Sequence, residues 1–271
     1  MPNANALKEL VAKELHVYYI LDTSGSMAKE PIAALNDAMR ATVKELEKIN
    51  KTNADADFKI CVLQFNSDVG WVTVDENGQP IVQDLEDFVW VDLNATGLTE
   101  LGDALMELSK MLSRNYLQKS TTGNKAPVII FMSDGGPTDT KTKWADGLAE
   151  LNKNAWYQQA IKIAFALGDS ADTDVLRTVV GKDGGVIKTS DLETFKALIK
   201  VVSVTSSLAA SVSKPKDSTP TGGSIAEQVT GLQGQDEGGV FTVPAGGLTE
   251  PDPYGNGGYT DVNFGNQVAF T

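Results

Sequence analysis

The chain has 271 residues, of which 41% are hydrophobic and 22% charged, and its formal net charge is −13. This composition is ordinary for a globular protein, and the acidic balance argues against nucleic acid or an anionic membrane surface as the main partner. One cysteine, Cys61, excludes a disulfide within the chain, and one histidine, His16, excludes zinc sites built from several histidines. We expect Cys61 to be a buried thiol, and His16 to pack or be solvated rather than to react.

Targeting and membrane signals are missing from the sequence. Residues 1–15, "MPNANALKELVAKEL", lack a basic region followed by a long apolar core, which a secretory signal would have. No stretch approaches the roughly 20 apolar residues that cross a bilayer. We therefore predict a cytoplasmic protein without a membrane partner.

The first half of the chain alternates apolar runs with one long amphipathic segment. "LHVYYIL" (15–21) and "FKICVLQF" (58–65) predict strands, and apolar residues at steps of three and four predict a helix over 31–49. "WVTVDENGQPIV" predicts a hairpin that turns at Asn77-Gly78. "FVWVDL" (88–93) is expected to continue near the edge of the sheet.

The second half continues the alternation of helices and strands. The most apolar strand is "APVIIFMSD" (126–134), as expected for a strand covered on both faces. Helices are expected at about 99–113, 140–152, 175–179 and 191–210, and further strands at 161–168 and 184–189. This order predicts an α/β fold with a mostly parallel sheet, to which the hairpin adds one antiparallel strand.

The composition changes after Ser213. Residues 214–271 hold 12 of the 25 glycines and 5 of the 10 prolines, and no helical period is visible. We expect an N-terminal extension (1–13), one domain (14–210) and a flexible acidic tail (211–271). The apolar residues of 241–271 suggest an interaction element, which either recruits a partner or plugs a site on the domain; an inert tail is the alternative.

Oxygen-bearing side chains stand at three strand or loop ends. In open α/β sheets, ligands bind at the carboxyl ends of the strands. Two serines flank Gly25 directly after the first strand, so a tight loop can turn both hydroxyls to one point. If the first strand and the strand over 126–134 are neighbours, five side chains converge: Asp22, Ser24, Ser26, Thr99 and Asp134.

The chemistry of these five side chains is uniform. Two carboxylates and three hydroxyls are hard oxygen donors, which suit an octahedral Mg²⁺ or Mn²⁺ that keeps some waters. "DTSGS" by itself is equally compatible with a turn followed by a helix cap. The matching Thr99 and Asp134 at the ends of later elements favour the metal site.

The segments "DTSGS", "TGLTELGDAL" and "SDGGPTD" resemble the metal-ion-dependent adhesion site of von Willebrand factor A (vWA) domains. That pattern is Asp-x-Ser-x-Ser, a Thr on a second loop and an Asp on a third, and each position is matched here. The resemblance covers about 14–210. "YYILDTSGSMAKEPI", "LGDALMEL" and "FKALIKVVSVTSSLAASVS" are also similar to the bacterial tellurium-resistance (TerY-like) branch, whereas the tail from 214 matches nothing.

The resemblance implies a fold and a function. The fold is a doubly wound six-stranded sheet of order 3-2-1-4-5-6, with one antiparallel edge strand and helices on both faces. The function is a non-enzymatic, metal-dependent protein-interaction module, whose ion takes a Glu or Asp of the partner. The TerY-like branch implies a cytosolic stress-response or phosphorylation-linked complex, with a protein kinase or phosphatase as a partner.

Two other classes of function remain open on the sequence. A metal-dependent phosphoryl-transfer enzyme could use Asp22 and Asp134. However, "GKDGG" (181–185) lacks the phosphate-loop pattern, and Lys29 is the only basic residue flanking the ligand loops. A surface adhesin could use the same site, but the missing signal peptide and disulfides argue against it.

Overall fold

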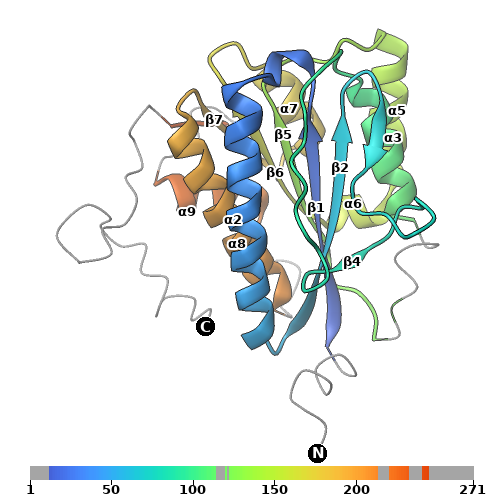
Figure 1. Ribbon diagram of the computed structural model, residues 1–271, viewed down its shortest axis with the longest axis vertical. Helices are drawn as coiled ribbons and strands as arrows, with labels where there is room; N and C mark the ends of the chain where they lie inside the picture. Colours follow the sequence, from blue (N-terminus) through green and yellow to red (C-terminus); the bar gives the residue numbers. More distant parts are fainter. Residues whose placement is uncertain (1–11, 114–119, 121, 213–219, 232–239, 244–271) are drawn as a thin grey trace, which may run out of the picture.

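The computed structural model describes residues 12–113, 120, 122–212, 220–231 and 240–243. An eight-stranded sheet lies at its centre, in the order β3-β2-β1-β5-β6-β7-β8, and β4 also pairs with β2 (Figure 1). The parallel strands are β1 (Lys13–Asp22), β2 (Ala56–Phe65), β5 (Val128–Ser133), β6 (Ile161–Leu167), β7 (Gly185–Thr189) and β8 (Val240–Thr242), and the antiparallel ones are β3 (Val69–Trp71) and β4 (Gln83–Asp84).

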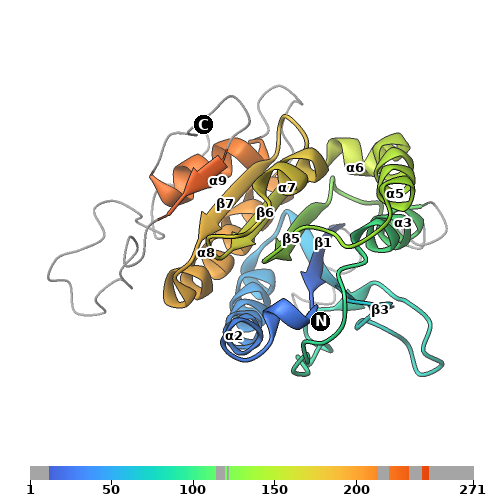
Figure 2. The ribbon, with the colours of Figure 1, turned by 90° about the horizontal axis from the view of Figure 1, so that it is seen from above.

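Helices cover both faces of this sheet, and Figure 2 shows α2 and α8 on the side opposite α3 and α5. Each face has its own apolar core, since alternate strand residues point to opposite sides. One core takes α2 (Glu30–Thr52), α8 (Leu192–Ser211) and α9 (Gly222–Thr230), and the other takes α3 (Leu101–Met111), α5 (Lys141–Lys153), α6 (Ala155–Gln159) and α7 (Thr173–Val180).

The predicted fold class is confirmed. Counted without β4 and β8, the strands lie in the order 3-2-1-4-5-6, and β1 is the parallel neighbour of β5 through pairs such as Val17 with Val128. All six residues of β5 are buried, which explains its uninterrupted apolar run. The hairpin near Gly78 is present, with a bridge between Val74 and Pro80.

Two segments differ from the expectation. Residues 88–93 form no strand; they run beside α2, where the buried Asn36 bonds to the main chain of Leu93 and to Trp90. Polar anchoring on a helix therefore replaces the expected pairing at the sheet edge.

The second difference lies after residue 213, where only a flexible tail was expected. Residues 222–230 form α9, which Thr221 caps in a reciprocal capping box with Ser224, and β8 extends the sheet beside β7. α9 lies against β6 and β7 through small residues. A segment rich in such residues is typical of a loop when it is judged by composition alone. The remaining prediction, an interaction element over 241–271, lies outside the described residues apart from 241–243.

The expectations for the single cysteine and the single histidine are confirmed. Cys61 is buried, and His16 is only 2% exposed, with its ring nitrogens beside Glu14 and the Tyr18 hydroxyl. Each of the four tryptophans packs against one of the two cores. None of the helices in the described ranges combines the length and the apolarity needed to span a membrane.

Candidate metal site

Three loops meet at the carboxyl end of β1 and β5. Asp22 is the last residue of β1, and Asp134 directly follows β5. Because these strands are parallel neighbours, their carboxyl ends lie at the same edge of the sheet. The backbone N–H of Gly25 donates to the carbonyl oxygen of Gly97 at 3.0 Å, which ties the loop after β1 to the loop before α3.

Thr99 lies two residues before α3, and the loop after β5 binds its backbone. The backbone N–H of Thr138 donates to the Thr99 carbonyl at 2.9 Å, and the Thr99 N–H donates to the Thr138 hydroxyl at 2.9 Å. Thr99 is only 6% exposed. Its position is therefore fixed through its backbone from the neighbouring loop.

Hydrogen bonds join four of the five predicted residues. The N–H of Ser24 donates to Asp22 Oδ1 at 2.8 Å, the hydroxyls of Ser24 and Ser26 lie 3.0 Å apart, and Ser26 donates to Asp134 Oδ1 at 2.8 Å. A serine has one hydroxyl proton. Since Ser26 gives its proton to Asp134, Ser24 is the donor in the bond between the serines.

The two carboxylates of the site have no basic partner in the part of the chain that the structure describes. Asp22 is fully buried and Asp134 is partly buried, and among the described residues neither forms an ion pair. Burial raises the pKa of both carboxyls; for Asp22, hydrogen bonds from Ser133 and Ser24 lower the pKa and the charge of Asp134 raises it. A buried carboxylate is costly without a compensating charge. A cation would supply that charge.

The donor set fits a hard divalent cation. In the part of the chain that the structure describes, no group of three or more His, Cys, Asp or Glu side chains is arranged to hold a metal. An ion here would therefore depend on two carboxylates, on hydroxyl oxygens and on water. Mg²⁺ and Mn²⁺ accept such oxygen-only sets, and Mg²⁺ normally keeps several waters.

One residue of the site was not predicted from the sequence. Ser133 donates to Asp22 Oδ2 at 2.6 Å, and it also bonds to the backbone of Gly135 in the loop after β5. It fixes the carboxylate at the end of β1 from the neighbouring strand. The available signal was a polar residue that closes a fully apolar strand directly before Asp134.

Asp139 caps a helix that is distant in the chain. Its Oδ2 accepts a hydrogen bond of 2.8 Å from the N–H of Gly102, in the first turn of α3, whereas α5 is capped by Thr140. Burial raises the pKa of Asp139. Because α3 follows Thr99, this bond ties the loop after β5 to the loop that carries Thr99.

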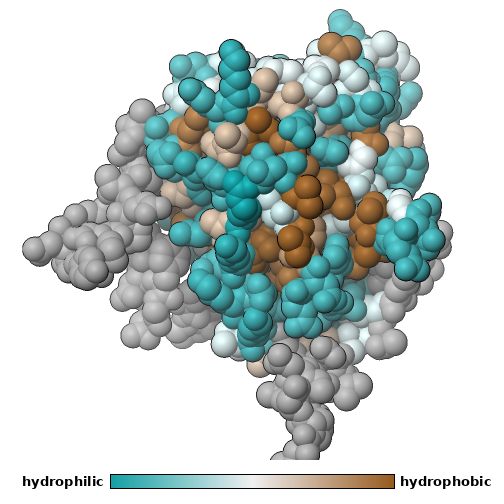
Figure 3. All heavy atoms as spheres, in the orientation of Figure 1, coloured by the Kyte–Doolittle hydropathy of each residue, from teal (hydrophilic) through white to brown (hydrophobic). Residues whose placement is uncertain are grey.

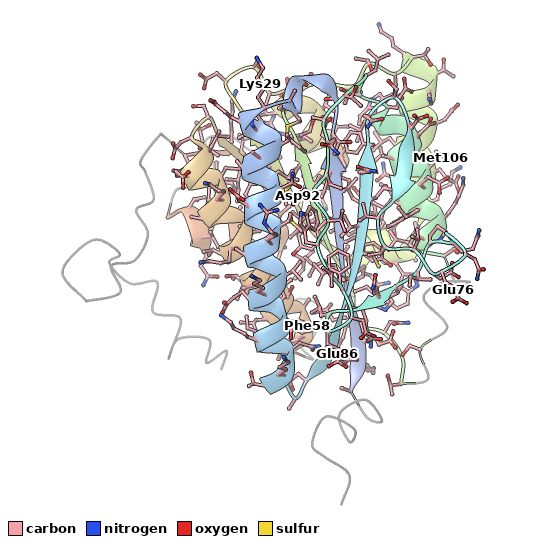
Figure 4. All side chains as sticks on the ribbon, viewed as in Figure 1. Lys29, Phe58, Glu76, Glu86, Asp92 and Met106 are labelled. Carbon is pink, nitrogen blue, oxygen red and sulfur yellow. The ribbon has the colours of Figure 1, made fainter. Side chains whose placement is uncertain are left out.

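Lys29, a basic residue that follows the loop after β1, has an unusual backbone. It is the one described non-glycine residue with a positive φ, 70°, and it precedes α2 as the N-cap residue. Figure 4 shows its side chain at the end of the molecule where β1 ends. Strained backbone of this kind often lies at functional sites.

Comparison with known proteins agrees with this geometry. Residues 17–137 match the family model of the von Willebrand factor type A domain. The described body has the fold of a vWA domain.

Solved structures share this fold at low sequence identity. A von Willebrand factor type A protein from Catenulispora acidiphila is 18% identical, with a TM-score of 0.50, over 70% of this chain and 43% of that one. The PilB minor pilin of Streptococcus sanguinis (14%, TM-score 0.53) covers 75% of this chain, and 64% of the pilin is matched. The pilus adhesin SpaC of Lactobacillus rhamnosus GG (12%, TM-score 0.55) covers 73%, and 30% of the adhesin is matched.

These identities show a common fold and nothing about shared ligands. The chain spans less than half the length of the Catenulispora acidiphila protein. No curated protein matches the sequence. The function must therefore be argued from the site itself.

Proposed function

We propose that this vWA domain is a metal-dependent protein-interaction module that binds an acidic residue of a partner protein through Mg²⁺ or Mn²⁺. The observation that carries this proposal is the joined set of two carboxylates and neighbouring hydroxyls, to which no basic side chain of the described residues is paired. The residues that would hold the ion are Asp22, Ser24, Ser26, Thr99 and Asp134.

Each residue has a distinct part in the proposed site. Asp22 and Asp134 provide the negative charge, while Ser24, Ser26 and Thr99 provide neutral oxygens. When bound, the ion would supply a local positive charge and a coordination position for a partner's Glu or Asp. Ser26 must release its hydrogen bond to Asp134 so that both oxygens can face the ion. Ser133 keeps Asp22 oriented throughout.

The proposal does not include catalysis. Sites of phosphoryl transfer combine metal ions with basic side chains that neutralise the phosphate oxygens. Within the described ranges, no lysine or arginine is paired to Asp22 or Asp134. We therefore propose a binding role, with turnover of nucleotides and phosphopeptides as the direct test of the enzymatic alternative.

The setting of the module is part of the proposal. The resemblance to the TerY-like branch supports a cytosolic stress-response or phosphorylation-linked complex, with a protein kinase or phosphatase as one partner. The pilin and the adhesin that share the fold are too dissimilar in sequence to support a surface location. Cell fractionation separates the two settings.

Calorimetric titration with Mg²⁺ and Mn²⁺ tests the site. We expect binding by the full-length protein, a large loss in Asp22→Asn and Asp134→Asn, and no change in the matched control Asp169→Asn, an exposed acid on another loop. A pull-down with and without chelator then identifies the partners that depend on the ion. Equal metal affinity in all three variants would refute the assignment.

A further inference from the structure

The two most exposed large hydrophobic side chains among the described residues lie on one short segment. Residues 88–93, here called the strap, contain Val89 and Val91, which are 78% and 66% exposed. Phe88 is buried and Trp90 is partly buried, so exposure alternates from residue 88 to residue 91 as in an extended chain, and Asp92 is exposed as well. Figure 3 shows apolar side chains gathered in the middle of the face on which Figure 4 labels Asp92.

The strap is held firmly from beneath. Asn36 of α2 accepts hydrogen bonds from the Leu93 N–H at 2.9 Å and from the Trp90 indole at 3.2 Å, and it donates to the Leu93 carbonyl at 3.0 Å. Arg40 of the same helix pairs with Asp92. The inner side of the strap is thus occupied, and its outer side carries the two valines.

The backbone of the strap is unpaired along its exposed part. No described residue forms a hydrogen bond with the N–H or C=O groups of residues 89–92. Unpaired backbone groups of an extended segment are the template on which another strand can pair. The strap therefore resembles an edge strand that lies outside the sheet.

The surroundings of the strap are acidic. Lys59 pairs with Asp84, and Lys51 lies near Glu86, but carboxylates outnumber these bases. Seven carboxylates lie on the strap, on the segment before it and on the adjoining strands and stripe of α2, against four basic side chains: Asp37, Glu47, Asp57, Asp84, Glu86, Asp87 and Asp92 against Arg40, Lys44, Lys51 and Lys59. Positive charge on an occupant would be favoured here.

We propose that the strap is a docking strand for an extended peptide segment of a partner protein, with apolar side chains at alternate positions and lysine or arginine at its ends. The peptide would pair with the backbone of residues 89–92 and cover Val89 and Val91, as in other cases of strand addition. The acidic surroundings would select its basic ends.

The strap is also continuous with the proposed metal site. Thr96, three residues after the strap, donates its N–H to the Thr23 carbonyl at 2.8 Å, and the next residue, Gly97, accepts from Gly25. A partner bound on the strap would therefore extend toward the loops that carry Ser24 and Thr99. Docking on the strap itself needs no ion, so it goes beyond the proposed metal-dependent function.

Charge argues against two other occupants. Residues 244–271 of this chain contain Glu250, Asp252 and Asp261 but no lysine or arginine. A second copy of the chain would bring a strap with the same acidic surroundings. Both would place like charges together.

The test uses the full-length protein in the presence of chelator, so that its outcome is separate from that of the metal site. The probes are acetylated and amidated octapeptides with valine or isoleucine at alternate positions, threonine between them, lysine at both ends and no carboxylate. We expect the amides of residues 89–92 to exchange fast in the free protein. We expect the probes to bind and to slow the hydrogen exchange of these amides at least tenfold.

Matched controls separate strand addition from other binding. Val89→Ser combined with Val91→Ser should weaken the peptide at least tenfold, while Val74→Ser, an exposed valine on the hairpin, should leave its affinity unchanged. Probes with alternate amides N-methylated should not bind. The proposal is overturned if no probe binds, or if binding survives the double substitution or the N-methylation. It is also overturned if the strap amides already exchange slowly in the free chain, because the tail or a second copy would then be the occupant.

Discussion

Two regions of this molecule differ in how they are built: the loops around Asp22, and the contact of α9 with β6 and β7. The first is built from polar side chains whose charge is uncompensated, and the second from backbones that approach closely over glycine. The first can lose a side chain with little effect on packing, whereas the second cannot accept even one methyl group. We therefore expect substitutions at the loops to change binding and substitutions under α9 to change stability.

The largest effect on stability is expected at Gly222. A Cβ at this position would lie 1.8 Å from the carbonyl oxygen of Lys162, so Gly222→Ala must displace α9. Overpacking of this kind costs about 1–3 kcal/mol, and we expect the upper end of that range. Urea denaturation of the full-length protein measures it.

Gly223→Ala is the matched control for this substitution. Its Cβ would meet no atom closer than 3.4 Å, and alanine favours the helix by up to about 1 kcal/mol. Equal stability of the two variants would show that α9 does not pack on β6 as described.

The largest effect on binding is expected at Asp22. We expect Asp22→Asn to lower the affinity for Mg²⁺ at least 30-fold, about 2 kcal/mol, because it removes the buried charge of the site. Metal-free stability should not fall, since the pKa of Asp22 is raised by burial and the neutral amide avoids that cost. Calorimetry and thermal unfolding in chelator measure the two quantities; a large loss of metal-free stability would mean that the carboxylate is mainly structural.

A pH-dependent effect is expected at Lys162 of β6, whose carbonyl oxygen faces α9 and whose side chain lies on the opposite face of the sheet, against α6. Lys162 is buried, its ammonium donates to the Tyr157 carbonyl at 3.0 Å, and burial lowers its pKa below 10.5. The folded state therefore releases this proton at a lower pH than the unfolded state does. Between the lowered pKa and 10.5, this lysine makes the unfolding free energy rise with pH.

The variant Lys162→Met isolates that contribution. Denaturation of wild type and variant at several pH values from 7 upward should show the unfolding free energy of the wild type gaining on that of the variant as the pH approaches 10.5. Parallel pH profiles would mean that Lys162 is solvated like an ordinary surface lysine.

A smaller effect on the site is expected from Ser133→Ala. The variant removes the donor to Asp22 Oδ2 but no proposed ligand. A hydrogen bond to a charged group contributes about 1.5–3 kcal/mol, part of which water can replace here, so we expect a three- to tenfold loss of Mg²⁺ affinity. Ser190→Ala is a control away from the site, and calorimetry should find its affinity unchanged. No loss in Ser133→Ala would show that Asp22 is oriented without this bond.

The same contrast explains what could be predicted from the sequence. The sheet order follows from apolar runs such as β5, and the proposed ligands Asp22 and Asp134 could be recognised because charge at the end of a buried strand is costly unless it has a use. Ser133 was missed because a hydroxyl at a strand end is equally typical of a turn.

The other misses have physical causes as well. α9 could not be predicted because its packing depends on the absence of side chains at Gly222 and Gly185. In a composition, glycines such as these indicate a flexible segment. The strap was expected near the sheet edge because its alternation is that of a strand; the deciding partner, Asn36, is more than fifty residues away in the chain.

The smallest effect is expected at Lys29, where the loop region stores strain rather than charge. Its φ of 70° and ψ of −115° are unfavourable for any residue with a Cβ. Lys29→Gly should therefore raise the unfolding free energy by about 0.5–1 kcal/mol, and it should leave Mg²⁺ affinity unchanged because Lys29 is not a proposed ligand. In contrast, Lys44→Gly, at an exposed position inside α2, should lower the unfolding free energy by about the same amount. Chemical denaturation distinguishes the opposite signs. If both glycine substitutions destabilise the protein equally, the backbone at Lys29 is not strained. The loops around Asp22 would then differ from the α9 contact in their charge and not in backbone strain.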